Sequence, residues 1–286
     1  MAGLNSIFNF LTSNILTRAE LFVGLIILLG YILQRKKWYE CVGGFFKGVI
    51  GYLILSIPIL LVEWIIGRFS PEKKDISSLR IIQAVFRFIL KITGAKITVI
   101  GEENVPKDTP VLYIGNHRSY FDILLTYSRC PIRTGYIAKK EMEKIPLLST
   151  WMRYLHCLFL DRKDIKQGLK TILTAVDKVK SGISICIFPE GTRNRNKDEL
   201  DMLPFHEGSF KIATKANCPI IPIAISNSAN IFEAHFPKIS PAKVVVEYGK
   251  PIYPDELSKE DKRHVGEYTQ NVIREMLIKN KPLTKK

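Results

Sequence analysis

The sequence predicts an α/β protein whose largely parallel seven-stranded sheet is flanked by helices and preceded by a hydrophobic, membrane-associated helical region. Two observations lead to this fold class. Residues 1–75 contain two long apolar stretches, and from Lys96 onward short apolar runs alternate with helical patterns. Such alternation is typical of parallel strands connected by helices that cover both faces of a sheet. We therefore expect membrane-associated helices over 1–75 and an α/β domain over 76–286.

The composition narrows the kinds of partner. The 286 residues carry a formal net charge of +15, from 42 Lys and Arg against 27 Asp and Glu. This excess predicts an anionic partner: nucleic acid, an acidic membrane surface or a phosphorylated substrate. The apolar N-terminal quarter favours the membrane. The five cysteines are far apart and form no CxxC or other zinc-ligand pair, so we expect buried thiols and no metal site.

The N-terminal region holds apolar stretches at 21–33 and 48–62. The first is shorter than the roughly 20 residues that a spanning helix needs. Between them, the basic segment 35–37 stands next to Trp38 and Tyr39, a combination typical of a membrane–water interface. The two stretches could form a hairpin through the bilayer or two helices embedded in one leaflet. A cleavable signal peptide is disfavoured, because no basic segment precedes the first apolar run.

Residues 79–93 form a third amphipathic stretch, in which Arg80, Arg87 and Lys91 recur among apolar side chains. A basic amphipathic helix can lie on an anionic membrane surface. It can equally pack its apolar face on the α/β domain. The sequence leaves both arrangements open.

Seven short apolar runs predict the strands, at 96–100, 111–115, 134–138, 157–160, 183–188, 219–225 and 243–248. Residues 164–180 predict a helix, because their apolar residues recur with helical spacing and Gly182 follows the last turn. A further helix is predicted over the tail from Ser258, with Ser258 and Asp261 as its N-cap pair.

The first group of residues that could carry chemistry is 116–122, NHRSYFD, directly after a predicted strand. On a single helix, His117 and Asp122 would lie about 140° apart. We therefore expect His117 in the loop and Asp122 in the first turn of the next helix, from where its carboxylate can reach the imidazole. A His oriented by a carboxylate is the arrangement of a general base. A capped helix with a hydrogen-bonded His would use the same two residues without catalysis.

The second group is 188–193, FPEGTR, which closes the most apolar predicted strand. Open α/β sheets bind ligands at the carboxyl ends of their strands. Gly191 lets the backbone approach an anion closely, Thr192 offers a hydroxyl group and Arg193 offers a guanidinium suited to phosphate. The alternative is a solvated basic turn.

Together, NHxSxxD at 116–122 and FPEGTR at 188–193 resemble the motifs of the glycerolipid acyltransferase family, specifically of bacterial 1-acyl-sn-glycerol-3-phosphate O-acyltransferases (lysophosphatidic acid acyltransferases). The two blocks occur in the family's order, and the resemblance covers about residues 80–255. FLDR at 159–162 looks like the family's second motif, and IPI at 221–223 looks like its fourth.

One departure from the family pattern is visible. His156 stands where the family usually has Gly, three residues before the Phe of the second motif, which puts the local backbone in question. Residues 18–52 also resemble the N-terminal segment of ascorbate-type sugar-phosphotransferase permeases, which we interpret as a shared style of membrane helix or a fused fragment.

The family resemblance implies direct acyl transfer without a covalent acyl-enzyme. His117 would deprotonate the acceptor hydroxyl, which attacks the thioester of acyl-CoA or acyl-carrier protein, and Asp122 would orient the imidazole. Arg193 and Arg162 would bind the acceptor phosphate. The other residues of the implied substrate pocket are Asn116, Arg118, Ser119, Lys139, Phe188, Pro189, Glu190, Gly191 and Thr192.

The implied product is phosphatidic acid for phospholipid biosynthesis, made at the cell membrane with the catalytic domain on the cytoplasmic side. The implied partners are membrane lipids, including lysophosphatidic acid, and the acyl donor, without nucleic acid, metal or other cofactor. An acyltransferase for another lysolipid fits both motifs as well. A membrane-anchored nucleic-acid binder would leave His117 and Asp122 unexplained, and a hydrolase with Ser119 as nucleophile lacks a GxSxG elbow.

Overall fold

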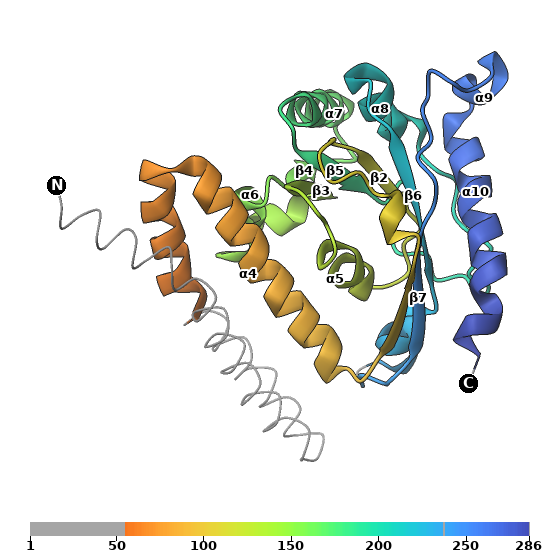
Figure 1. Cartoon of the computed structure of the whole chain (residues 1–286), viewed down its shortest axis with the longest axis horizontal. Coiled ribbons are helices and arrows are strands. Elements are labelled where there is room, and N and C mark those ends of the chain that lie inside the picture. The colour runs from red at the N-terminus through yellow and green to blue at the C-terminus, as the bar shows by residue number, and fades with distance from the viewer. Residues whose placement is uncertain (1–54, 237, 286) are drawn as a thin grey trace.

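The structure is a computed structural model that describes residues 55–236 and 238–285 (Figure 1). Residues 55–69 are helical. The helices and strands that follow are, in chain order, α4 (Pro71–Ile92), β1 (Lys96–Ile100), β2 (Leu112–Gly115), α5 (Phe121–Tyr127), β3 (Thr134–Lys139), α6 (Leu148–Tyr154), β4 (Leu158–Leu160), α7 (Ile165–Lys180), β5 (Ser184–Ile187), α8 (Lys211–Ala216), β6 (Ile220–Ser226), the 3₁₀ helices η4 (Ser228–Ile231) and η5 (Glu233–His235), β7 (Lys243–Tyr248), α9 (Lys259–Arg263) and α10 (Val265–Asn280).

The seven strands form one sheet in the order β1-β7-β6-β2-β5-β3-β4. The five strands from β6 to β4 are parallel to one another, whereas β7 is antiparallel to β6 and β1 is parallel to β7. This confirms the predicted largely parallel seven-stranded sheet. Each predicted strand is present, and no boundary differs by more than one residue.

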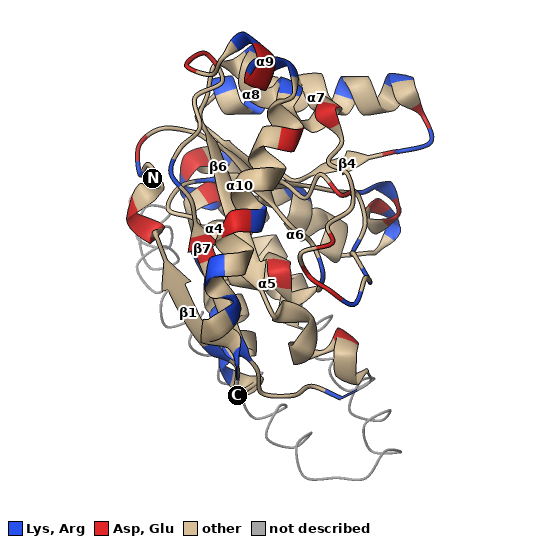
Figure 2. Ribbon diagram, turned by 90° about the vertical axis from the view of Figure 1, so that its right-hand side faces the viewer, with Lys and Arg blue, Asp and Glu red and all other residues tan. Residues whose placement is uncertain are grey.

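Helices cover both faces of the sheet. Along β2, Leu112 and Ile114 pack with residues of α7, α8 and α10, whereas Tyr113 packs with residues of α4 and α5. These helices accordingly lie on opposite sides of the sheet (Figure 1). The central strands β2, β5 and β6 carry no charged residue, and the charges lie on helices, loops and outer strands (Figure 2). Strands enclosed on both faces need this continuous apolar composition.

The basic amphipathic stretch predicted at 79–93 belongs to α4, which packs on the α/β domain. Leu79 and Leu90 are buried in the same core as α5, while Arg80 is exposed. Of the two arrangements left open, the structure contains the packed one. The boundary predicted between residues 75 and 76 falls inside this continuous helix.

The predicted C-terminal helix is divided in two. Ser258 caps α9 by accepting a hydrogen bond from Asp261 N at 3.0 Å, as predicted. His264 then leaves the helical conformation, with φ −117° and ψ 40°, and α10 begins directly after it. The prediction of one helix was therefore wrong at this position, because periodicity alone does not locate a break of one residue.

The apolar stretch 21–33 and residues 48–54 of the second stretch lie outside the described residues. Within 55–236 and 238–285, none of the helices combines the length and the apolar character that crossing a bilayer requires. The helix at 55–69 exposes Ile57, Leu61 and Trp64, with exposed fractions of 55–57%. Its buried Glu63 accepts hydrogen bonds from the hydroxyl groups of Ser77 and Ser78 in α4, so a polar contact joins the two helices.

His156, which replaces the family's usual Gly, has a left-handed backbone with φ 59°. The backbone is crowded here, since a Cβ atom on Gly135 would lie 2.3 Å from the His156 carbonyl oxygen. The imidazole Nε2 lies 2.8 Å from Asp75 Oδ2 of α4. Burial by itself would raise the pKa of Asp75, but the hydrogen bond and charge of His156, together with Lys74, lower it overall. The side chain of His156 therefore compensates for a backbone that favours glycine.

We predict that His156→Gly is more stable than His156→Ala, although both variants lose the contact with Asp75. Glycine removes the left-handed strain of about 1 kcal/mol that alanine keeps. For a domain of this size the difference corresponds to roughly 2–4 °C in Tm, measurable by thermal unfolding. Lys170 is the control, because it lies exposed within α7. There Gly should be less stable than Ala by about 1 kcal/mol. If the Gly variant were less stable than the Ala variant at both positions, the strain at His156 would be contradicted.

Candidate active site

The two predicted motifs meet at one edge of the sheet. Segment 116–122 follows β2, and segment 188–193 follows β5. The two strands are parallel neighbours, with Ile114 paired to Ile187, so both loops leave the sheet at adjacent carboxyl ends. This is the position at which parallel sheets bind ligands.

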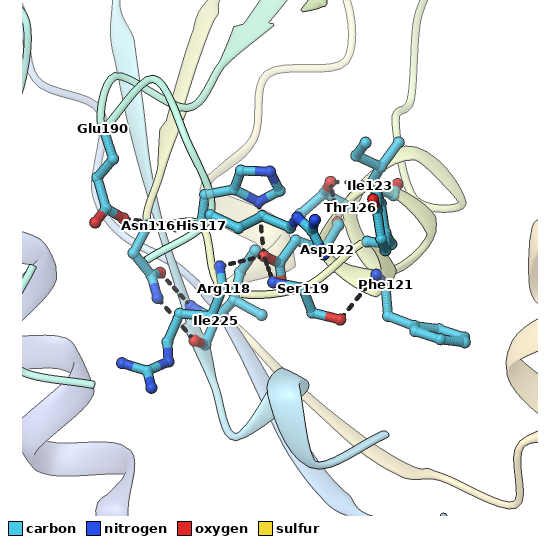
Figure 3. A network of polar contacts seen from close by, with 12 residues as sticks. Asn116, His117, Arg118, Ser119, Phe121, Asp122, Ile123, Thr126, Glu190 and Ile225 are labelled. Carbon is cyan, nitrogen blue, oxygen red and sulfur yellow. Dashed lines mark hydrogen bonds and ion pairs between the residues drawn. The ribbon is translucent and has the colours of Figure 1, made fainter. Parts of the chain in front are cut away.

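His117 and Asp122 form the predicted pair (Figure 3). His117 Nδ1 lies 2.9 Å from Asp122 Oδ2, with His117 in the loop and Asp122 in the first turn of α5. The same carboxylate oxygen accepts hydrogen bonds from the backbone N–H groups of Arg118 at 2.7 Å and Ser119 at 2.8 Å. Asp122 is completely buried. An ionised Asp122 places the proton of the neutral imidazole on Nδ1, which leaves Nε2 to accept a proton.

The backbone of His117 is held from the neighbouring loop. His117 N donates to Glu190 Oε1 at 2.7 Å, and Asn194 N donates to His117 O at 2.7 Å. The imidazole also stacks on the ring of Phe188, with centroids 4.4 Å apart and an angle of 14° between the planes. Loop 188–194 therefore fixes both the backbone and the ring of His117, and the imidazole remains partly exposed to solvent.

Glu190 lies inside the site rather than on its surface. Its second oxygen, Oε2, accepts a hydrogen bond from Leu203 N at 2.9 Å, so each carboxylate oxygen has a backbone donor. Burial raises the pKa of Glu190, and the two backbone hydrogen bonds oppose that shift without cancelling it. Its hydrogen bonds connect segment 116–122 with the loop before α8. The observed contacts of Glu190 are structural, and its contact with the acceptor stays a prediction.

Three other predicted pocket residues also bond within the protein. The Asn116 amide exchanges two hydrogen bonds with the backbone of Ile225 in β6, at 2.9 and 2.8 Å. The Arg118 guanidinium donates to the carbonyl groups of Asn196 and Asp198. The Ser119 hydroxyl donates to Glu233 at 2.6 Å. These three side chains join segment 116–122 to β6, to the loop after β5 and to η5.

The Gly191 turn brings Arg162 to the site. Gly191 has φ 74°, and a Cβ atom here would lie 3.2 Å from His206 Nε2 and 3.6 Å from Arg162 Nη1. The backbone conformation therefore favours glycine, and a Cβ atom would also be a tight contact for the His206 ring. Thr192, the next residue, is exposed. The second motif, at the end of β4, thus lies beside the FPEGTR loop.

Arg193 is held by two groups. Its Nη1 donates to Glu233 Oε1 at 3.1 Å, and its guanidinium carbon lies 3.6 Å from the centroid of the Tyr120 ring. A guanidinium held against an aromatic face by a carboxylate has a defined position, and its other N–H groups can bind an anion.

Two predicted pocket residues have other surroundings. Lys139 ends β3 at the same edge, but its ammonium pairs with Glu141 at 3.1 Å on the surface. Pro189 is buried, and its carbonyl group accepts a hydrogen bond from His206 N at 3.1 Å. Among residues 55–236 and 238–285, no three His, Cys, Asp or Glu side chains gather as metal ligands would.

The chain matches a known family model and known proteins. A family model described as Acyltransferase matches residues 96–226. A 1-acyl-sn-glycerol-3-phosphate acyltransferase of Borreliella burgdorferi is 30% identical over 200 residues, which make up 69% of this chain and 76% of that protein. A Saccharomyces cerevisiae protein of the same name is 31% identical over 194 residues, 67% of this chain and 62% of that protein. The chain belongs to the acyltransferase family. The predicted resemblance is confirmed.

This acyltransferase is also similar to a solved structure. The crystal structure of the 1-acyl-sn-glycerophosphate (LPA) acyltransferase PlsC from Thermotoga maritima superposes with a TM-score of 0.71 at 25% identity, and the match covers 91% of this chain and 98% of that one. A second family model, described as PTS system sugar-specific permease component, matches residues 14–93. The matched segment includes α4, which packs on the acyltransferase domain.

Neither motif of the acyltransferase indicates Glu233, His206 or Asn194. Glu233 lies 114 positions from its partner Ser119, in a segment with no motif. Only the parallel pairing of β6 with β2 brings the two together. His206 and Asn194 were missed for a different reason: their site contacts depend on how the loop after β5 folds back.

We predict that Glu190 makes stability fall as the pH rises. A folded-state pKa raised above its ordinary value of 4.5 means that the native protein binds the proton more tightly than the unfolded chain. The stabilisation is complete below pH 4.5 and is lost as the pH rises through the raised pKa. Glu190→Gln should lose this contribution. The free energy of unfolding of the wild type minus that of the variant should therefore decrease as the pH rises across that window. Urea unfolding from pH 4 to 7 measures it, with exposed Glu256→Gln as control. A difference that stays constant or increases would refute it.

Proposed function

We propose that this acyltransferase transfers a fatty acyl group to the free hydroxyl of 1-acylglycerol-3-phosphate, giving phosphatidic acid. The observation that carries the proposal is the His117–Asp122 pair at 2.9 Å, in one strand-end site with Arg193. The names of the relatives also support this acceptor. The direct test is to incubate purified protein with an acyl thioester and lysophosphatidate and to identify the lipid product.

In the proposed reaction, His117 Nε2 removes the proton of the acceptor hydroxyl. The oxygen attacks the thioester carbonyl and forms a tetrahedral intermediate. The intermediate expels the thiolate, which takes the proton back from the imidazolium. One ester and one thiol result, and the enzyme returns to its starting state. Asp122 keeps the imidazole in the required tautomer and stabilises its positive charge during the transfer.

The acceptor phosphate would bind at the FPEGTR loop. Arg193 would supply the N–H groups that Glu233 does not use, Thr192 a hydroxyl group, and Arg162 a second guanidinium from the end of β4. The donor would be acyl-CoA or acyl-carrier protein. Both deliver the acyl group as a thioester, so the same base serves either.

The substrate would be taken from a membrane. The acceptor is a lipid, and the exposed Ile57, Leu61 and Trp64 offer apolar surface for a bilayer. The net charge of +15 favours anionic lipid headgroups. We therefore propose that the enzyme works at the cell membrane, with this domain on the cytoplasmic side and membrane association through the N-terminal region.

We predict that His117→Ala lowers kcat by about 10²–10⁴ while the protein remains folded. Asp122→Asn should also be strongly impaired, because the neutral amide cannot stabilise the positive charge that the imidazole gains during the transfer. Turnover of both variants is measured together with circular dichroism and Tm. The control is Lys170→Ala, on the exposed face of α7. If His117→Ala keeps more than a tenth of the activity, His117 is not the general base.

We predict that Arg193→Ala raises the KM for lysophosphatidate about 10–100-fold, because it removes charged hydrogen bonds of about 1.5–3 kcal/mol. The KM for the acyl donor should change much less. Arg193→Lys keeps the charge without the planar guanidinium, so its KM for lysophosphatidate should lie between those of the wild type and Arg193→Ala. Equal weakening of both substrates would refute a specific role at the phosphate.

A further inference from the structure

Glu233 makes three contacts to the site, although it belongs to neither sequence motif. Oε2 accepts a hydrogen bond from Ser119 Oγ at 2.6 Å. Oε1 accepts from Tyr120 N at 2.8 Å and from Arg193 Nη1 at 3.1 Å. Glu233 begins η5, which follows β6, so a third strand end contributes to the site beside those of β2 and β5.

These contacts fix Arg193 from two directions. The carboxylate binds the guanidinium directly, and it also holds the backbone of Tyr120. The Tyr120 ring is the surface on which the guanidinium rests, at 3.6 Å from its centroid. One residue thus positions both the cation and its aromatic support. The side chains of Arg193 and Glu233 are each only about a fifth exposed, at 22% and 21%, so solvent screens their attraction incompletely.

The arrangement requires a carboxylate. Three donors converge on Glu233, and an ionised carboxylate presents two oxygens that accept from all of them. A glutamine could keep these contacts only with its oxygen at the Oε1 position and its nitrogen turned to the Ser119 hydroxyl, and it would hold the guanidinium without a negative charge. Losing the negative charge would also free the long side chain of Arg193 to sample other rotamers.

We propose that Glu233 is a positioning residue for the acceptor: it holds Arg193 on Tyr120 in the orientation that receives the acceptor phosphate. This inference rests on the proposed function, since the phosphate is that of the proposed acceptor. Glu233 acts through Arg193 and not on the substrate. A carboxylate near a phosphate also repels it, so the sign of the mutational effect separates positioning from simple charge neutralisation.

The test is a double-mutant cycle between Glu233→Gln and Arg193→Ala in the full-length enzyme. In the wild-type background, Glu233→Gln should raise the KM for lysophosphatidate about tenfold, as for the loss of a charged hydrogen bond. The KM for acyl-CoA and kcat should change by less than about threefold. In the Arg193→Ala background, Glu233→Gln should raise the acceptor KM no further, because coupled residues are non-additive. Glu233→Asp, which keeps the charge, should restore part of the affinity.

Glu102→Gln is the matched control. It breaks another carboxylate–arginine pair, Glu102–Arg129 at 3.3 Å. Glu102 follows the end of β1, and β1 runs antiparallel to β2, so this pair lies at the end of the sheet opposite the site. It should leave both KM values unchanged. An equal rise of the acceptor KM in both backgrounds overturns the inference, as does an unchanged or lowered acceptor KM in Glu233→Gln alone.

A readout without substrate separates this inference from the proposed function. In protein labelled with ¹⁵N-arginine, the guanidinium signals of Arg193, assigned by their loss in Arg193→Lys, report whether the group is held. Glu233→Gln should mobilise Arg193 whichever acceptor the enzyme uses. Unchanged signals would overturn the positioning role. Absence of phosphatidic acid from wild-type assays would instead refute the proposed function alone.

Discussion

The parallel pairing of β5, β2 and β6 at the centre of the sheet is the constraint on which the site depends. These strands are uncharged and buried on both faces, so their register is determined by apolar packing. Because their carboxyl ends coincide, loops from distant parts of the chain emerge side by side. His117, Arg193 and Glu233 come from these three loops. The hydrophobic core therefore determines where the polar groups meet.

Three carboxylates organise the loops once the strands have placed them. Asp122, Glu190 and Glu233 each accept backbone N–H groups from segment 116–122. Burying a carboxylate is unfavourable unless such donors compensate for the lost water. The donors are therefore held in place by the same charges that they stabilise. This mutual dependence holds the His117 loop in one conformation, and in the proposed reaction it leaves the imidazole Nε2 for proton transfer.

Most of the motif residues are occupied with this task. Asn116, Ser119 and Glu190 use their polar atoms within the protein, whereas Thr192 is exposed and Arg193 is the proposed phosphate contact. Under the proposed function, the short motifs combine a rigid loop scaffold with a few groups that would face the ligand. A general base and an anion site both need preorganisation of this kind, because reorienting their groups during the reaction would raise the barrier.

Local sequence patterns predict the α/β fold class, all seven strands and the His117–Asp122 contact, because these depend on apolar runs and on residues a few positions apart. The resemblance of the motifs predicted the family and pointed to Arg162 as a further candidate site residue. Tertiary structure alone decided that α4 packs on the domain, that His264 breaks the last helix, and that Glu233 completes the Arg193 site. It also decided which motif side chains are satisfied internally. The reason is physical: a hydrogen bond between Ser119 and Glu233 has no local signal, since it exists only after the strands between them have paired.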